Sequence, residues 1–327
     1  MQEPLSPLHM RMKCFPVYLM TNVDYSVVVP VYNSEESLSE LHHRLVPVFE
    51  KLHQDFELIL IDDGSRDKSW EVMQKLHEKY KRVKIVQLMK NFGQNNALMC
   101  GLNFASGNRM IIMDDDLQHL PEEIPKLISK MDEGYDVVYG KYLKKKHVWY
   151  RNIASTLVYG SFSKMIGLKM KVSAFKIINR QVVNEIIKFK SQNPHIDIYI
   201  ARVLSPQRIS NVIVRHASRK YGETNYNFWT LSKWALDILF NFTTYPLTLA
   251  IIIGFFFSIF SFFLAFLYFI SYFLTDIHVS GFTTLILAVT FFSGIILFVI
   301  GIIGRYIGSI FLDVNNKPQF VIRNVKK

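Results

Sequence analysis

Three consecutive carboxylates, Asp114, Asp115 and Asp116, directly follow the apolar run RMIIM. Like charges at this spacing repel one another, so a bound cation or a charged ligand would offset their repulsion. Side chains alternate along an extended chain, which places Asp114 and Asp116 on one side, with Gln118 just beyond them. Hard oxygen ligands of this kind suit Mg²⁺ or Mn²⁺, which complete their coordination with phosphate and water.

An alternative use for the three carboxylates is to stabilise the start of the helix predicted near Pro121, because a helix N-terminus attracts negative charge. Glu122 and Glu123 already supply negative charge there. The sequence therefore predicts a divalent cation and a diphosphate at Asp114 and Asp116.

The elements that must position these carboxylates form a regular series from residue 25 to residue 140. Short β-rich runs alternate with helical segments, and the runs are YSVVVPV, FELILID, VKIVQLM, RMIIMD and YDVVYG. Helices are predicted at about 34–54, 68–80, 94–105 and 121–134. Such alternation is typical of a parallel sheet with helices on both faces.

Polar loops follow the first four predicted strands: PVYNSEE, DDGSRD, KNFGQNN and DDDLQH. Each loop alone also fits ordinary turn chemistry. In parallel α/β sheets, however, ligands bind beyond the carboxyl ends of the strands. Four polar loops converging there predict one ligand site.

Two long segments, 238–275 and 277–304, contain no Asp, Glu, Lys or Arg. Each exceeds the roughly 20 apolar residues that cross a bilayer core, so two transmembrane helices are predicted. Their connector contains Asp276 and no Lys or Arg, whereas the segment after the second span is basic. The positive-inside rule then places the α/β domain and both termini in the cytoplasm.

The formal net charge is +11, and part of it lies in the run KYLKKKH at residues 141–147. In a membrane-anchored chain, this run favours anionic lipid or a phosphorylated substrate over nucleic acid, with a solvated loop as the alternative. The segment near 147–167 has apolar residues at helical spacing with flanking Trp, Tyr and Lys, which predicts an interfacial helix, with a core-facing helix as the alternative. A second interfacial helix is predicted at 225–245, before the first span.

The predicted organisation is an unassigned segment 1–24, an α/β domain 25–224, the interfacial helix 225–245, two spans within 246–306 and a basic tail 307–327. The motifs PVYNSEE, LIDDGSRD, KNFGQ and DDDLQHLPEEIP, in this order and followed by two spans, resemble the family 2 glycosyltransferases. More narrowly, they are similar to polyprenyl-phosphate sugar transferases such as dolichol-phosphate mannose synthase and the bacterial undecaprenyl-phosphate glucosyl- and aminoarabinose-transferases. The resemblance covers about residues 25–320 and implies an α/β fold of the GT-A type.

The resemblance also implies roles for individual residues. The nucleotide-sugar would be bound by Pro30, Tyr32, Glu36, Asp62, Asp63, Lys90, Gln94 and Asp115. The metal would be held by Asp114, Asp116 and Gln118, and the catalytic set would be Asp116, Arg151, Lys176 and Arg219, with the two arginines contacting phosphate.

Three positions depart from the family pattern. Ser34 stands where an acidic residue is usual, and Thr224 and Asn225 stand where Ser and Lys are common. Lys176 replaces an expected arginine, which keeps the positive charge and loses the bidentate fork.

The reaction that the resemblance implies is inverting transfer of a sugar from a nucleotide-sugar to undecaprenyl phosphate for cell-envelope glycosylation, in a bacterial inner membrane. It favours UDP over GDP and, by family precedent, a homotetramer. A phosphate monoester is largely a dianion at pH 7, so the acceptor needs no strong base. Asp115 or Asp197 could serve as a base, with a structural role as the alternative for each.

Other functions compete with this prediction. Transfer to a hydroxyl of another membrane lipid would need a base, and a membrane-anchored binding protein could retain the nucleotide fold without catalysis. A processive polysaccharide synthase is disfavoured because the chain lacks its Gln-x-x-Arg-Trp motif and its additional spans.

Overall fold

The structure is a computed structural model that describes residues 23–142, 172–217, 245–274, 281–314 and 318–327. Arg151, Arg219 and the predicted interfacial helix near 147–167 lie outside these residues, as does nearly all of the predicted helix at 225–245. The predictions for these segments therefore stay predictions.

The α/β domain follows the predicted alternation of strands and helices through its first five strands. Its elements are β1 (Tyr25–Val31), α1 (Leu38–Leu52), β2 (Phe56–Asp62), α2 (Ser69–Lys79), β3 (Val83–Leu88), α3 (Gln94–Phe104), β4 (Arg109–Ile112), η1 (Pro121–Glu123), α4 (Ile124–Asp132), β5 (Val137–Tyr142), β6 (Lys176–Asn179), α6 (Arg180–Ile186), α7 (Ile196–Val203), η2 (Pro206–Arg208) and β7 (Ile209–Val214). Two long helices and a last strand follow: α9 (Tyr245–Leu274), α10 (Phe282–Val314) and β8 (Ile322–Lys326).

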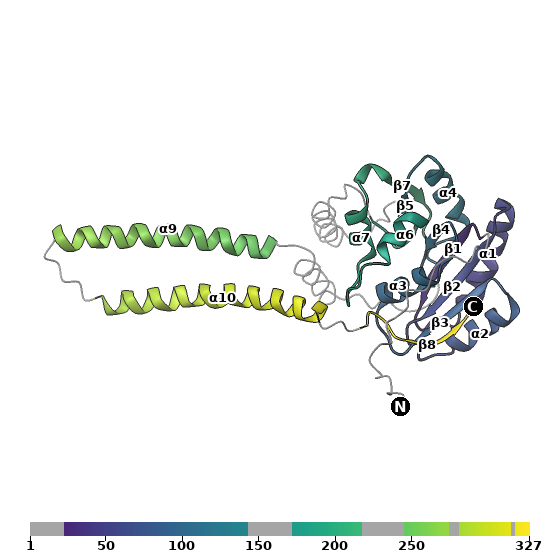
Figure 1. Cartoon of the computed structure of the whole chain (residues 1–327), viewed down its shortest axis with the longest axis horizontal. Coiled ribbons are helices and arrows are strands. Elements are labelled where there is room, and N and C mark those ends of the chain that lie inside the picture. The colour runs from purple at the N-terminus through teal and green to yellow at the C-terminus, as the bar shows by residue number, and fades with distance from the viewer. Residues whose placement is uncertain (1–22, 143–171, 218–244, 275–280, 315–317) are drawn as a thin grey trace, which may run out of the picture.

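These strands form one eight-stranded sheet in the order β7-β5-β6-β4-β1-β2-β3-β8 (Figure 1). The central strands β4, β1, β2 and β3 are parallel to one another, as the βαβ alternation predicts. Strand β6 enters between β4 and β5 and is antiparallel to both. The sheet is therefore parallel at its centre and mixed toward its edges.

Helices cover both faces of the sheet because its central strands are apolar on both sides. In β1, Val27, Val29 and Val31 face one layer, which contains α1, α2 and α4. Val28 faces the other layer, which contains α3, α6 and α7. All seven residues of β1 and of β2 are buried, as expected for strands that are covered twice.

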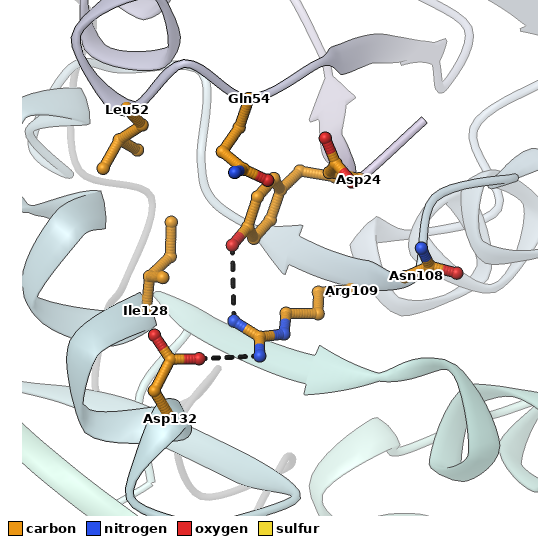
Figure 2. Close-up of a pocket in the computed structure, with 8 residues that line it drawn as sticks. Asp24, Leu52, Gln54, Asn108, Arg109, Ile128 and Asp132 are labelled. Carbon is orange, nitrogen blue, oxygen red and sulfur yellow. Dashed lines mark hydrogen bonds and ion pairs between the residues drawn. The ribbon is translucent and has the colours of Figure 1, made fainter. Parts of the chain in front are cut away.

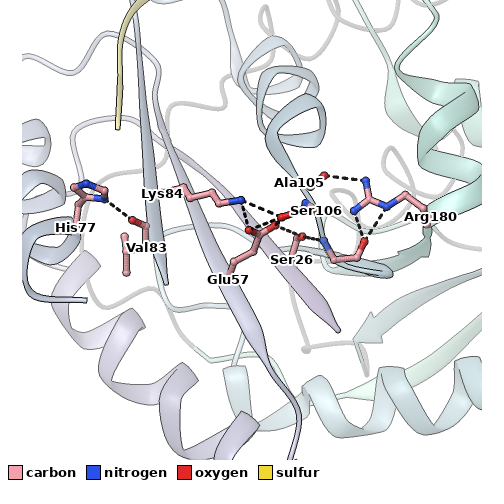
Figure 3. A network of polar contacts seen from close by, with 9 residues as sticks. Ser26, Glu57, His77, Val83, Lys84, Ala105, Ser106 and Arg180 are labelled. Atoms are coloured by element: carbon pink, nitrogen blue, oxygen red, sulfur yellow. Dashed lines mark hydrogen bonds and ion pairs between the residues drawn. The ribbon is translucent and has the colours of Figure 1, made fainter. Parts of the chain in front are cut away.

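A buried polar network holds the amino edge of the sheet, where the central parallel strands begin (Figure 3). Glu57 accepts hydrogen bonds from Ser26 Oγ at 2.6 Å and from the Ser106 amide at 2.6 Å, and it forms an ion pair with Lys84. Arg180 donates to the carbonyls of Ala105 and Gly107 on the same turn. The network fixes the connection between α3 and β4.

Strand β8 comes after α10 in the chain and pairs antiparallel with β3, at the edge of the sheet. The sequence analysis gave residues 307–327 only as a basic tail. The structure instead extends α10 to Val314 and places residues 322–326 in the sheet.

Helices α9 and α10 run side by side away from the sheet, and Phe257 of α9 contacts the rings of Phe291 and Phe292 (Figure 1). Among the described residues, one segment is long and apolar enough to cross a bilayer, Phe291–Phe311 of α10, with 21 residues and a mean hydropathy of 2.0. At 1.5 Å per residue it extends roughly 30 Å, which matches a hydrocarbon core. In α9 the corresponding apolar segment, Pro246–Phe257, is shorter, so the second predicted span stays a prediction.

Candidate active site

The four polar loops meet at the carboxyl edge of the sheet, where β1 to β4 end. The Asn33 amide donates to Ser65 Oγ at 3.0 Å, which joins the loop after β1 to the loop after β2. Gly64 has φ of 73°, and a Cβ there would lie 2.7 Å from the Asn91 nitrogen. Only glycine fits this left-handed turn against the loop after β3. The predicted convergence of the loops is confirmed.

The acidic loop reaches its arrangement by a different route from the one expected. Strand β4 ends at Ile112, so Asp114, Asp115 and Asp116 lie in a loop and not in an extended strand. Leu117 adopts a left-handed conformation with φ of 60°, and the Gln118 amide donates to Asp116 Oδ1 at 3.0 Å. This tight turn, rather than strand alternation, sets the directions of the carboxylates.

Asp115 is bonded to the loop after β1, and the placement of Asp114 and Asp116 together on one side stays a prediction. Asp115 turns back to the loop after β1, where it accepts hydrogen bonds from Ser34 Oγ at 2.5 Å and from the Tyr32 amide at 3.3 Å. Burial raises the pKa of Tyr142, and the charges of Asp114 and Asp116 both raise it further. Both carboxylates therefore lie near enough to Tyr142 for their charges to act on its hydroxyl.

The pKa of Asp115 reflects its burial and its charged and polar neighbours. Burial raises the pKa of Asp115 to about 7, and the hydrogen bond from Ser34 opposes this rise while the charge of Asp114 adds to it. The hydroxyl of Ser34, at a position where the family usually has an acid, thus supplies a donor to Asp115. A carboxylate at position 34 would instead add to the repulsion.

His119 holds the backbone of the acidic loop through a hydrogen bond, a role that was not predicted from the sequence. Its Nδ1 accepts the Asp114 amide at 2.9 Å, and burial lowers the pKa of His119 to about 4. The imidazole is therefore neutral with its proton on Nε2, which lies 3.6 Å from Asp114 Oδ2. Phe175 stacks on the ring with centroids 5.3 Å apart. The imidazole five residues after Asp114 was the only signal for this role in the sequence.

Among the predicted nucleotide-binding residues, several lie exposed along the carboxyl edge. Tyr32 is 41% exposed, and Glu36, Lys90 and Gln94 are also exposed. Gln94, the first residue of α3, donates to Asp114 Oδ1 at 2.6 Å. This bond connects the loop after β3 to the acidic loop.

Three other predicted nucleotide-binding residues are buried: Pro30, Asp62 and Asp63. Asp63 accepts the amides of Phe92 and Gly93 at 2.7 and 2.8 Å, and Asp62 accepts the Ser65 amide at 2.8 Å. Burial raises the pKa of Asp63 to about 6. In this structure these carboxylates organise the loops, so any part in nucleotide binding stays a prediction.

Lys176 is buried at the start of β6, where it forms an ion pair with Asp197 of α7 and lies over the ring of Tyr139 at 5.2 Å. The Tyr139 hydroxyl donates to the same Asp197 oxygen at 3.0 Å. The sequence analysis had treated Lys176 and Asp197 separately. The structure joins them, and it places the Lys176 charge close enough to His119 to contribute to the low pKa of that imidazole.

The chain after β7 is held against the acidic loop. His119 and His216 form an isolated antiparallel bridge, and the Ala217 amide donates to the Gln118 carbonyl at 3.1 Å. Arg215 pairs with the buried Glu123 at 2.6 Å. These contacts direct the chain toward position 219, which lies outside the described residues.

The predicted metal ligands consist of two carboxylates and one amide. In the described part of the chain, no cluster of three or more His, Cys, Asp and Glu side chains is arranged to hold a metal ion. The set Asp114, Asp116 and Gln118 contains only oxygen-bearing side chains, which fits Mg²⁺ or Mn²⁺ sharing its coordination with phosphate. The charges of Asp114 and Asp116 add to the rise in the pKa of Asp115 that burial causes, and a cation at this loop would offset them.

A cavity of about 500 Å³ lies at the opposite, amino edge of the sheet (Figure 2). It is lined in part by Tyr25 and Arg109, which begin β1 and β4. Arg109 is paired with Asp132 at 2.7 Å and donates to the Tyr25 hydroxyl at 3.3 Å. The cavity is therefore separate from the predicted site.

The α/β sheet brings its four polar loops together at the carboxyl edge. The model of the family described as Glycosyl transferase family 2 matches residues 26–187. Relatives at least 30% identical cover more than nine tenths of this chain. The chain belongs to glycosyl transferase family 2 and is a glycosyltransferase.

Two relatives and one solved structure illustrate these similarities. An uncharacterized glycosyltransferase, YkcC of Bacillus subtilis, is 32% identical over 92% of this chain and 94% of its own length. The undecaprenyl-phosphate 4-deoxy-4-formamido-L-arabinose transferase of Proteus mirabilis is 33% identical over 92% of this chain and 93% of its own length. Glucosyl-3-phosphoglycerate synthase of Mycobacterium tuberculosis, solved with Mn²⁺, UDP-glucose and phosphoglyceric acid, is 18% identical with a TM-score of 0.49, over 66% of this chain and 77% of that chain.

Proposed function

We propose that this glycosyltransferase moves a sugar from a UDP-sugar to polyprenyl phosphate at a membrane surface, with inversion at the anomeric carbon. The observation that carries the proposal is the 33% identity to the Proteus mirabilis undecaprenyl-phosphate transferase over 92% of this chain. The similarity thus extends well beyond the matched nucleotide-sugar region at 26–187. The bacterial character of the resembling enzymes favours undecaprenyl phosphate over dolichyl phosphate and UDP over GDP.

The nucleotide-sugar would occupy the carboxyl edge of the sheet. Exposed Tyr32, Glu36, Lys90 and Gln94 supply one aromatic ring, two charges and an amide along this edge. The diphosphate would lie at Asp114, Asp116 and Gln118, where Mg²⁺ or Mn²⁺, when bound, would neutralise the charge that develops on the leaving diphosphate. Arg151 would contact the phosphate of the acceptor, Arg219 would contact phosphate at the site, and Lys176 would add positive charge from the sheet.

The polar contacts of two carboxylates support a phosphate acceptor over a hydroxyl acceptor. Asp115 is engaged by Ser34 and the Tyr32 amide, and Asp197 is engaged by Lys176 and Tyr139. These were the two residues considered as a general base. A phosphate dianion needs no such base, because it is already deprotonated near pH 7.

The sheet supports a chain that crosses the membrane twice. Strands β1 to β7 precede α9 and α10, whereas β8 follows them, and all eight strands share one sheet. The two parts of the sheet must lie on the same side of a bilayer, so the chain between them crosses it an even number of times. If α10 crosses the bilayer, a second crossing is needed to bring the chain back to the same side. Among the described helices, α9 would supply it, since its 30 residues include no charged side chain.

The test is transfer of labelled sugar into the lipid phase. The full chain in detergent would be incubated with Mn²⁺ or Mg²⁺, undecaprenyl phosphate and a panel of labelled UDP- and GDP-sugars. We expect butanol-extractable label from one UDP-sugar and its loss in Asp116→Asn. Asp132→Asn is the matched control, because the same substitution at the opposite edge of the sheet leaves the site untouched.

The outcomes separate the alternatives. Label that appears with diacylglycerol in place of undecaprenyl phosphate would assign a hydroxyl acceptor. Transfer from a GDP-sugar would overturn the choice of nucleotide. Nucleotide binding without transfer to any lipid would assign a binding protein and overturn the proposal.

A further inference from the structure

Strand β8 is joined to the part of the sheet that carries the predicted nucleotide loops. It pairs with β3 from Ile85 to Leu88, and the Met89 amide donates to the Val321 carbonyl at 2.9 Å. Met89 directly precedes Lys90, one of the predicted nucleotide-binding residues. The chain that follows α10 thus reaches the carboxyl edge of the sheet before it runs back along β3.

A β-bulge sets which residues of β8 face which side. Leu88 lies opposite Ile322 and Gln87 lies opposite Asn324, so Arg323 is the extra residue without a cross-strand partner. In a regular strand, residues 322 and 324 would point to the same face. The bulge instead allows Ile322 to pack on the buried core beside Leu88 while Asn324 meets Gln87.

From Asn324 a chain of hydrogen bonds runs to two loops of the predicted nucleotide site. Asn324 Nδ2 donates to Gln87 Oε1 at 2.8 Å, and Gln87 Nε2 donates to Asp62 Oδ2 at 3.2 Å. Asp62 Oδ1 accepts the Ser65 amide at 2.8 Å. Ser65 Oγ in turn accepts the Asn33 amide at 3.0 Å. The chain connects the strand after the membrane helices to the loops after β2 and β1.

The chemistry of each group fixes the direction of this chain. The buried Asp62 carboxylate only accepts, so the Gln87 amide must turn its nitrogen toward it and its oxygen toward β8. That oxygen accepts a hydrogen bond from Asn324. An aspartate at position 324 would place a second acceptor against it, with nearly the same size and shape.

We propose that Asn324 is a positioning residue for the nucleotide-sugar: through Gln87 and Asp62 it holds the loops at 32–36 and 62–67 in their binding arrangement. That the ligand is a nucleotide-sugar rests on the proposed function. That Asn324 is coupled to the loops rests on the four hydrogen bonds. It makes the strand that follows the membrane helices a part of the donor site.

The test compares full-length Asn324→Asp and Asn324→Ala with Arg323→Ala, the matched control at the bulged position. The first measurement is the rate of hydrogen exchange of the Asn33 and Ser65 backbone amides in the absence of nucleotide. We expect exchange to rise about two- to tenfold in Asn324→Asp, as for the loss of one hydrogen bond, and less in Asn324→Ala. Arg323→Ala should leave both amides unchanged.

The second measurement is the affinity for UDP, determined by calorimetry in the presence of Mn²⁺. For the active enzyme, KM for the nucleotide-sugar and kcat are determined separately. Asn324→Asp should weaken UDP binding and raise KM for the nucleotide-sugar about two- to tenfold with little change in kcat. Unchanged exchange at both amides, or equal effects from Arg323→Ala, would overturn the proposal. Failure of the unsubstituted chain to bind UDP or GDP would instead overturn the proposed function, and the exchange measurement would still decide whether Asn324 orders the loops.

Discussion

The pKa values of carboxylates at the two edges of the sheet shift in opposite directions. At the amino edge, burial would raise the pKa of Glu57, but hydrogen bonds from Lys84, Ser26 and Ser106 outweigh it and leave the pKa below its usual value. At the carboxyl edge, the hydrogen bonds to Asp63 and Asp115 do not offset burial, and their pKa values rise to about 6 and about 7. Hydrogen bonds at the amino edge thus favour the charged form of Glu57, whereas those at the carboxyl edge do not offset the cost of burying Asp63 and Asp115.

The largest effect is expected at the amino edge. Glu57→Ala removes the acceptor shared by Ser26, Ser106 and Lys84, so we expect a loss of about 3 kcal/mol in the free energy of unfolding. Urea unfolding followed by tryptophan fluorescence would measure it. Glu133→Ala, which removes an exposed ion pair with Lys130, should leave the unfolding free energy nearly unchanged. Equal losses in the two variants would contradict the structural role of the network.

Asp114→Asn should show the reverse behaviour at the carboxyl edge. We expect transfer activity to fall at least about 100-fold, because a carboxylate facing the diphosphate site loses its charge. The unfolding free energy should stay the same or rise, since the substitution relieves repulsion with Asp115 and Asp116. A stability loss as large as that of Glu57→Ala would remove the contrast between the two edges.

Lys176 tests whether a buried ion pair near the carboxyl edge also stabilises the fold. Lys176→Met removes the cation that pairs with Asp197 and keeps the bond from Tyr139, so a loss of about 1–3 kcal/mol in unfolding free energy is expected together with lower transfer. Lys176→Arg keeps the charge and should restore most of both quantities. Full activity in Lys176→Met would show that Lys176 has no part in the reaction.

The smallest effect concerns the dependence of stability on pH. The folded pKa of Asp63 is raised from 3.8 to about 6, so the native state binds more protons than the unfolded state between these values. Asp63 therefore contributes a fall in stability as pH rises from about 4 to 6.

In Asp63→Asn this contribution disappears, although lost hydrogen bonds to Phe92 and Gly93 lower stability overall. The slope of unfolding free energy against pH should become more positive by at most about 1.4 kcal/mol per pH unit. Unfolding curves at pH 4.5, 5.5 and 6.5 for both proteins would measure this change. An unaltered slope would show that Asp63 titrates normally in the folded protein.

Much of the fold was predictable because the central strands are continuous apolar runs. The predicted bounds of β1 and β2 agree with the structure, and those of β3 agree to within one residue. Strand β6 was missed because KIIN is only four residues long and pairs with strands far from it in sequence. Strand β8 was missed because IRNVK is polar and half exposed, as is common for an edge strand, and so it reads as a basic tail.

The residues of the site were easier to find than their contacts. Strand alternation does not apply to the carboxylates of the acidic loop, because β4 ends at Ile112 and a left-handed Leu117 follows them. The role of Asp63 as acceptor for two amides depends on a loop some 30 residues away, which local patterns do not encode. The pairing of Lys176 with Asp197 likewise depends on how α7 packs against the sheet.

The position of β8 in the chain also determines when the sheet can be completed during protein synthesis. Because a ribosome releases the chain from its N-terminus, β1 to β7 emerge before the two long helices, and β8 emerges only after them. At usual elongation rates of about 5–20 residues per second, the outer edge of β3 stays uncovered for roughly 10 to 50 seconds. Through that interval the nascent domain presents an open strand that can pair wrongly, and it lacks the last support of its donor loops. The enzyme would thus complete its sheet only once its anchor has been made.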